Sequence, residues 1–154
     1  MKLKLAGAVL VAALVPAGAL AHHGGTEPNP AHTCKAQQQS MGAAAFKTLY
    51  GNFGTCVSRV AKAQNENQAE AMSACAQERA ANPTAFAAKY GMKGLGKCVS
   101  AVAKQQNAAE SQATVRAAKQ CKMLTAAQLS AQYGNGKNAF GKCVSARAQA
   151  AQNG

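Results

Sequence analysis

Six cysteines are the residues whose type and spacing predict chemistry most directly. An even number of cysteines in a short chain is typical of a disulfide framework, which oxidising compartments preserve. Between the second and third cysteines, and between the fourth and fifth, the sequence lacks proline and glycine and favours an unbroken helix. Even 19 helical residues span about 28 Å, whereas a disulfide needs Cα atoms about 4.4–6.8 Å apart. The natural pairs that remain are Cys34–Cys56, Cys75–Cys98 and Cys121–Cys143.

Lysines in glycine-containing loops are the second set of candidate residues. Residues 91–98 and 136–143 match the nucleotide-binding pattern G-x4-G-K, but cysteine replaces the serine or threonine that would hold magnesium. The element before each loop is predicted to be a helix, whereas the motif requires a strand, so we reject a nucleotide site. Exposed N–H groups at helix starts nevertheless attract anions. The candidate anion-binding residues are Lys93, Lys97, Lys137 and Lys142.

Histidines form the third set, at the expected start of the mature chain. Cleavage after Ala21 would leave His22 with a free amine beside its imidazole, a pair that can chelate Cu(II), with His23 and His32 nearby. The competing interpretation is a flexible tail with incidental metal affinity. No acid/base pair is evident among the five glutamates, the chain has no aspartate, and no C-x-x-C motif is present. We therefore expect no enzyme and no cofactor, with copper as the alternative.

The first 21 residues have the layout of a secretory signal peptide. A basic start, an apolar run over residues 5–14 and the small-x-small site at residues 19–21 follow one another, and the run is too short for a membrane anchor. Residues 22–33 have no helical pattern, and we expect them to form a flexible lead-in. The sequence therefore predicts a secreted or envelope-associated protein with no transmembrane anchor.

The sequence contains a module that is repeated three times, and this module must position the cysteines and lysines. Each copy ends in a closing segment, FGTCVS at 53–58, LGKCVS at 95–100 and FGKCVS at 140–145, after a short helix that ends in Tyr-Gly. Caps and i, i+4 apolar pairs place these short helices at 43–50, 83–90 and 126–133. We expect an all-α fold in which three tandem disulfide-stapled modules form an extended array. The modules are 34–62, 75–104 and 121–154, joined by spacer helices at 63–74 and 105–120 that have almost nothing to bury.

The repeated motifs resemble those of a group of bacterial proteins. YGNGKNAFGKCVS at 133–145, together with AFAAKYG at 85–91, resembles uncharacterised exported repeat proteins of high-GC Gram-positive bacteria. The likeness covers residues 34–145; the first copy departs from it by a shorter loop and the third by Leu129 in place of phenylalanine. The resemblance implies an exported array of helical modules and no activity.

Charge suggests what such an array would bind. The chain carries 17 Lys/Arg and five Asp/Glu, and loss of Lys2 and Lys4 with the leader would lower its net charge from +12 to +10. A field of this sign favours an anionic cell-wall polymer or membrane surface. Specific nucleic-acid binding is not expected, because no ladder of stacking aromatic residues accompanies the charge. The main prediction is thus a non-catalytic interaction protein. The alternatives are copper binding, with or without oxidase activity, at His22, a purely structural envelope spacer, and lysines that serve solubility alone.

Overall fold

A computed structural model describes residues 29–136 and 138–153, and these residues form seven α-helices and no strand. This confirms the all-α class. Within the described residues, no helix is both long and apolar enough to cross a bilayer. The helices are α1 (Pro30–Met41), α2 (Ala43–Tyr50), α3 (Phe53–Ala81), α4 (Pro83–Tyr90), α5 (Leu95–Lys122), α6 (Ala126–Tyr133) and α7 (Ala139–Asn153).

The short helices α2, α4 and α6 begin and end where the sequence predicts. The Asn82 side chain accepts a hydrogen bond from the Ala85 N–H at 3.0 Å, and proline follows at the first helical position. Thr125 and Gln128 form a reciprocal capping box at the start of α6. Glycine follows the last tyrosine of each short helix with φ between 76° and 88°, a region that favours glycine because it has no Cβ.

All six cysteines lie in the described residues, and they form the three predicted bonds. The Cα atoms are 6.0, 6.0 and 6.1 Å apart in Cys34–Cys56, Cys75–Cys98 and Cys121–Cys143. Each bond joins the helix before a short helix to the helix after it. Three disulfides in a chain of this size suggest an oxidising, extracellular environment.

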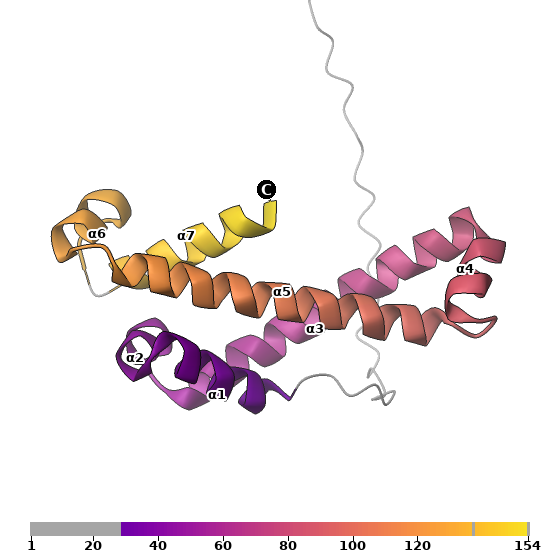
Figure 1. Cartoon of the computed structure of the whole chain (residues 1–154), viewed down its shortest axis with the longest axis horizontal. Helices are drawn as coiled ribbons and strands as arrows, with labels where there is room; N and C mark the ends of the chain where they lie inside the picture. Colours follow the sequence, from indigo (N-terminus) through magenta and orange to yellow (C-terminus); the bar gives the residue numbers. More distant parts are fainter. Residues whose placement is uncertain (1–28, 137, 154) are drawn as a thin grey trace, which may run out of the picture.

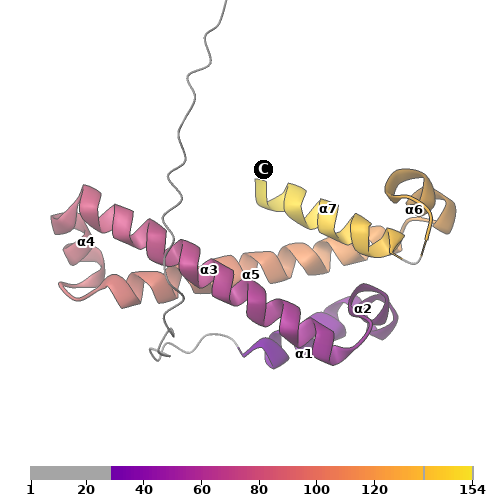
Figure 2. The same ribbon diagram turned by 180° about the vertical axis from the view of Figure 1, so that it is seen from behind.

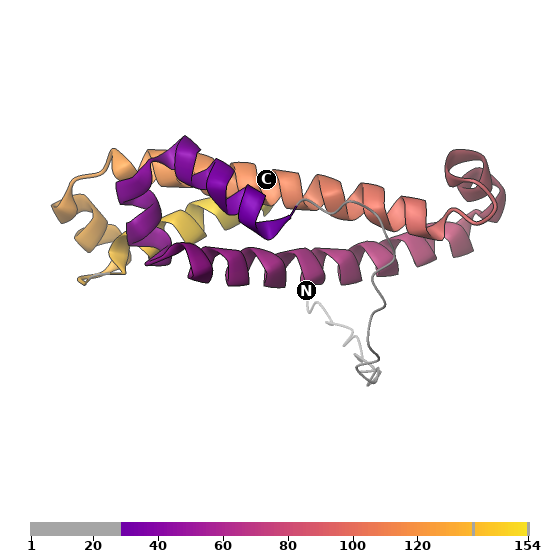
Figure 3. The ribbon, with the colours of Figure 1, turned by 90° about the horizontal axis from the view of Figure 1, so that it is seen from below.

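The long helices α3 and α5 lie side by side and antiparallel, and α4 connects them at one end (Figures 1 and 3). We call residues 71–103 at that end the tip. At the opposite end, α1 packs on both long helices and α7 returns along α5, as the view from behind shows (Figure 2). We call this end, residues 30–60 and 111–153, the body. The first and third modules thus meet in the body, and the second forms the tip alone.

Two cores correspond to these two ends. The body core joins Cys34 and Phe46 of the first module to Val144 of the third, together with buried alanines of α5. The tip core is smaller and is built around Phe86 and its disulfide. The modules therefore do not lie apart along an open array, because two of them share one core.

Two other expectations are corrected. The segments 63–74 and 105–120 are helical, but the expectation that they have almost nothing to bury is wrong, because they contain the buried residues Gln64, Ala71, Asn107, Ala113, Ala117 and Ala118. Alanine is small enough for two helices to approach closely, so these segments pack without large apolar side chains. The expected flexible lead-in is also partly wrong, because α1 begins at Pro30 with Asn29 as its N-cap. Residues 1–28, which include the expected signal peptide, lie outside the described residues.

Candidate functional site

The predicted anion-binding lysines do not converge on one site. Lys93 and Lys97 are exposed at the tip, and Lys142 is exposed in the body. Lys97 precedes Cys98 and Lys142 precedes Cys143, which is bonded to Cys121. The helix from residue 98 to residue 121 is about 35 Å long at 1.5 Å per residue, so the two groups lie at opposite ends. Lys137 lies outside the described residues.

The body carries cations without acids. Residues 30–60 and 111–153 contain no aspartate or glutamate. In the tip, by contrast, Glu78 forms an ion pair with Lys89 at 3.1 Å, and between the two ends Glu66 pairs with Lys62 at 3.7 Å. The cations of the body in the described residues are Lys35, Lys47, Arg59, Arg116, Lys119, Lys122, Lys142 and Arg147, and all but Arg147 are exposed.

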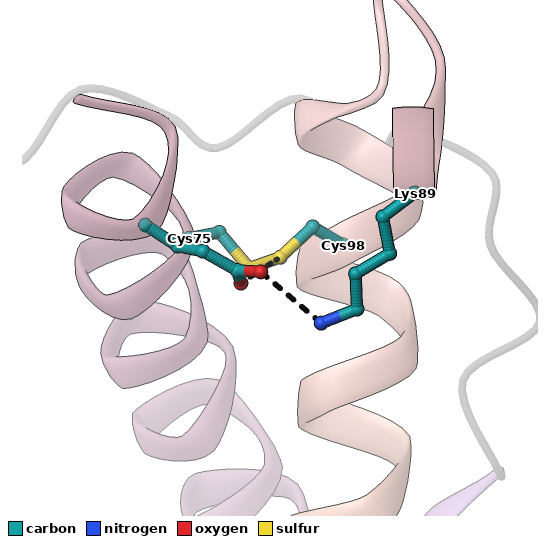
Figure 4. A network of polar contacts seen from close by, with 4 residues as sticks. Cys75, Lys89 and Cys98 are labelled. Atoms are coloured by element: carbon teal, nitrogen blue, oxygen red, sulfur yellow. Dashed lines mark hydrogen bonds and ion pairs between the residues drawn. A yellow bond between two sulfur atoms is a disulfide. The ribbon is translucent and has the colours of Figure 1, made fainter. Parts of the chain in front are cut away.

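The disulfide of the tip lies beside that ion pair (Figure 4). Glu78 Oε2 is 3.9 Å from Cys98 Sγ, and its other carboxylate oxygen accepts a hydrogen bond from Lys89 Nζ. Tyr90 and then Glu78 raise the pKa of Lys89, whose ammonium is 4.7 Å from the centre of the Tyr90 ring. Cys75 and Cys98 are buried, which keeps the sulfurs away from an attacking thiolate. This setting supports a structural role for the bond.

The histidine prediction falls largely on residues that the structure does not describe. His22 and His23 lie among them, and His32 is exposed on α1. No group of three or more metal-ligating His, Cys, Asp or Glu side chains occurs in residues 29–136 and 138–153. The copper site therefore stays a prediction from the sequence.

A polar layer separates the body core from the tip core, and it was missed at the sequence level. It consists of Gln64 and Asn67 of α3 and Asn107 and Glu110 of α5. Asn67 Nδ2 donates to Asn107 Oδ1 at 2.7 Å and to Glu110 Oε2 at 3.1 Å. The spacings i, i+3 in α3 and i, i+3 in α5 are those of residues that share a helix face. The shared face is the signal in the sequence that could have indicated a polar contact between the two helices. Polar residues on an alanine-rich helix are, however, usually interpreted as exposed.

A second polar chain connects α2, α1 and α5. The Tyr50 hydroxyl donates to Gln37 Oε1 at 2.7 Å, and Gln37 Nε2 donates to Ser111 Oγ at 3.1 Å. Burial raises the pKa of Tyr50 to about 12, Arg59 opposes the shift, and Glu110 adds to it. The phenol therefore remains a neutral donor over the physiological pH range.

Between these two networks is a cleft of about 220 Å³ at the junction of α1, α2, α3, α5 and α7. Its walls include Gln37, Tyr50, Arg59, Gln64, Glu110 and Val144. One cation, one carboxylate, several amides and hydroxyls, and an apolar wall thus face a common space. The cleft is thus a concave place where polar groups of different kinds converge.

No protein-family model, curated protein or solved structure matches this chain significantly.

Proposed function

We propose that the chain is an exported, non-catalytic interaction protein that binds an anionic envelope surface or polymer through distributed cations, mainly those of the body. The observation that carries this proposal is the acid-free body. Lys47 on α2, Lys119 on α5 and Lys142 on α7 are exposed there, and no carboxylate of the body neutralises them. The candidate lysines of the tip lie on the end that also carries the Glu78–Lys89 ion pair.

Distributed charge explains why no single anion pocket is needed. An exposed cation interacts weakly with a single anion in water, but many cations on one end create a field that concentrates polyanions and anionic surfaces. Binding of this kind weakens as salt screens the field over a Debye length of about 10 Å at 0.1 M. No single lysine should be essential for it.

The test measures binding of the mature chain to the isolated envelope of the producing cell, followed by a wash in molar salt. We expect the wild-type protein to bind at low ionic strength and to be released by the wash. The body variant Lys119→Gln/Lys142→Gln should bind about thirtyfold more weakly to an anionic membrane, at about 1 kcal/mol for each of the two cations near the surface.

The matched control is Lys93→Gln/Lys97→Gln, which removes the same charge from the tip. We expect it to lose less than about threefold in affinity. Salt-insensitive binding would contradict the electrostatic proposal, and equal losses for both variants would contradict the assignment to the body. A protein that binds no envelope component at low salt would favour the structural-spacer alternative.

A further inference from the structure

We propose that the cleft between α1, α2, α3, α5 and α7 binds a small zwitterion, an α-amino acid with an apolar side chain, with its ammonium at Glu110 and its carboxylate at Arg59. This inference does not depend on the binding of a polyanion. It assigns a role to a cleft of the described residues whose walls include the buried Gln37, Gln64 and Asn107.

Glu110 is the group that would bind the ammonium of the ligand. Its side chain is half-buried and lines the cleft. Asn67 donates one hydrogen bond to it, but no cation within the described ranges lies within the 4.0 Å of an ion pair, although cations greatly outnumber acids in this chain. A partly desolvated carboxylate is costly without a cationic partner. An ammonium group of a ligand would supply that partner.

Arg59 is the group that would bind the carboxylate of the ligand. It lines the same cleft from α3, and its guanidinium is 5.9 Å from the centre of the Tyr50 ring. Its Nη1 reaches the Leu49 carbonyl at the long distance of 3.5 Å, and no carboxylate of the described chain pairs with it. A guanidinium presents a planar fork of donors that matches a carboxylate. The rim of the cleft thus has a free anion-binding group.

Tyr50 lies within the electrostatic reach of both charges, since Arg59 and Glu110 act on its hydroxyl in opposite directions. A purely anionic ligand would be repelled by Glu110, and a purely cationic one by Arg59. A zwitterion satisfies both groups and keeps the cleft neutral.

The size and the remaining walls of the cleft narrow the ligand class. Its volume of about 220 Å³ exceeds the roughly 150 Å³ that holds a benzene molecule, and it is smaller than the usual range of about 300–1,000 Å³ for drug-sized ligands. Leu49, Val60, Val144 and Ala148 provide apolar surface. A single amino acid with an aliphatic side chain fits this combination of volume, charge and apolar wall.

The experiment titrates the ¹⁵N-labelled, disulfide-bonded chain with L-leucine to about 10 mM, a range that detects weak binding. Two analogues serve as matched ligands: N-acetyl-L-leucine lacks the ammonium, and L-leucinamide lacks the carboxylate. We expect saturable amide shifts around residues 37, 50, 59 and 110 with L-leucine, and affinities at least about tenfold lower for both analogues. This comparison needs no variant to fold.

Protein variants then assign each charge. Glu110→Gln should weaken L-leucine binding about tenfold but should not weaken the binding of N-acetyl-L-leucine, which loses a repelling carboxylate. Arg59→Gln should likewise weaken L-leucine binding but not the binding of L-leucinamide. Glu70→Gln, which removes an exposed glutamate of α3, is the control and should leave all affinities unchanged. The proposal would be overturned if L-leucine gave no saturable shifts, or if either analogue bound as tightly as L-leucine.

Discussion

The body and the tip are built from the same module, yet they differ in what supports it. The Phe46–Tyr50 pair of the body and the Phe86–Tyr90 pair of the tip both have ring centres 4.9 Å apart. The disulfides next to these pairs have the same Cα separation of 6.0 Å. In the body, however, the module packs against α5 and α7 in a shared core, whereas the tip has only its own small core. Local sequence thus sets local structure, and the neighbours decide how strongly it is held.

Matched phenylalanine substitutions give the largest test of this difference. Phe46 and Phe86 are 2% and 3% exposed, so Phe46→Ala and Phe86→Ala remove the same buried group from the two ends. We expect Phe46→Ala to lower the free energy of unfolding of the whole chain by about 4 kcal/mol. Phe86→Ala should instead open the tip while the body keeps its stability. Denaturant unfolding followed by hydrogen exchange of each segment measures both quantities.

An equal loss of hydrogen-exchange protection in the body and in the tip would contradict the difference between the two ends. If Phe86→Ala lowered the protection of α7 as much as that of α4, the chain would be one cooperative unit, and the separation of its two cores would have no energetic meaning.

Removal of one disulfide at a time gives the next effect. The bonds close loops of nearly equal length, with sequence separations of 22 to 23, so the chain-entropy model assigns each about 3 kcal/mol. For Cys121→Ala/Cys143→Ala we expect that full loss in global stability, because α6 and α7 are released from the shared core. For Cys75→Ala/Cys98→Ala we expect faster exchange confined to residues 83–95. Thermal unfolding that shifted equally in both variants would contradict this expectation.

A glycine of the tip provides a smaller, strictly local test. A Cβ built at Gly94 would lie 2.4 Å from the Tyr90 Cβ and 2.5 Å from the Tyr90 carbonyl carbon and oxygen, whereas a Cβ at Gly96 would meet nothing within 4 Å. Gly94→Ala must therefore shift backbone, and we expect it to destabilise the tip by about 2 kcal/mol. Gly96→Ala, within α5, should be neutral or stabilising by a few tenths of a kcal/mol. Exchange rates of α4 compare the two variants, and equal rates would refute the predicted clash.

The sequence predicts the elements of this fold far better than their packing. The helical spacing of Cys56 and Cys75 excludes one pairing, and capping patterns mark the starts of the short helices, because caps and disulfides obey local geometry. The contact between Gln37 and Ser111 joins residues 74 positions apart, and no local sequence pattern predicts it. The cleft and the polar layer depend on such contacts. The sequence therefore predicts the helices correctly but not the cleft that they form together.

A tyrosine pair gives the smallest and most specific difference between the two ends. The Tyr50 hydroxyl donates to the buried Gln37, so Tyr50→Phe leaves an acceptor unsatisfied and should cost about 1 kcal/mol. Tyr90→Phe, at the same place in the tip module, is the control and should cost less.

Because burial raises the folded-state pKa of Tyr50 to about 12 from about 10 when unfolded, folding favours the neutral phenol. Its contribution is complete below pH 10 and is lost as the pH rises through 12. The stability difference between wild type and Tyr50→Phe should therefore shrink over that interval, and tyrosinate absorbance should assign the late titration to Tyr50. A constant difference from pH 9 to pH 12 would show that the Tyr50 hydroxyl is not buried in the body as described.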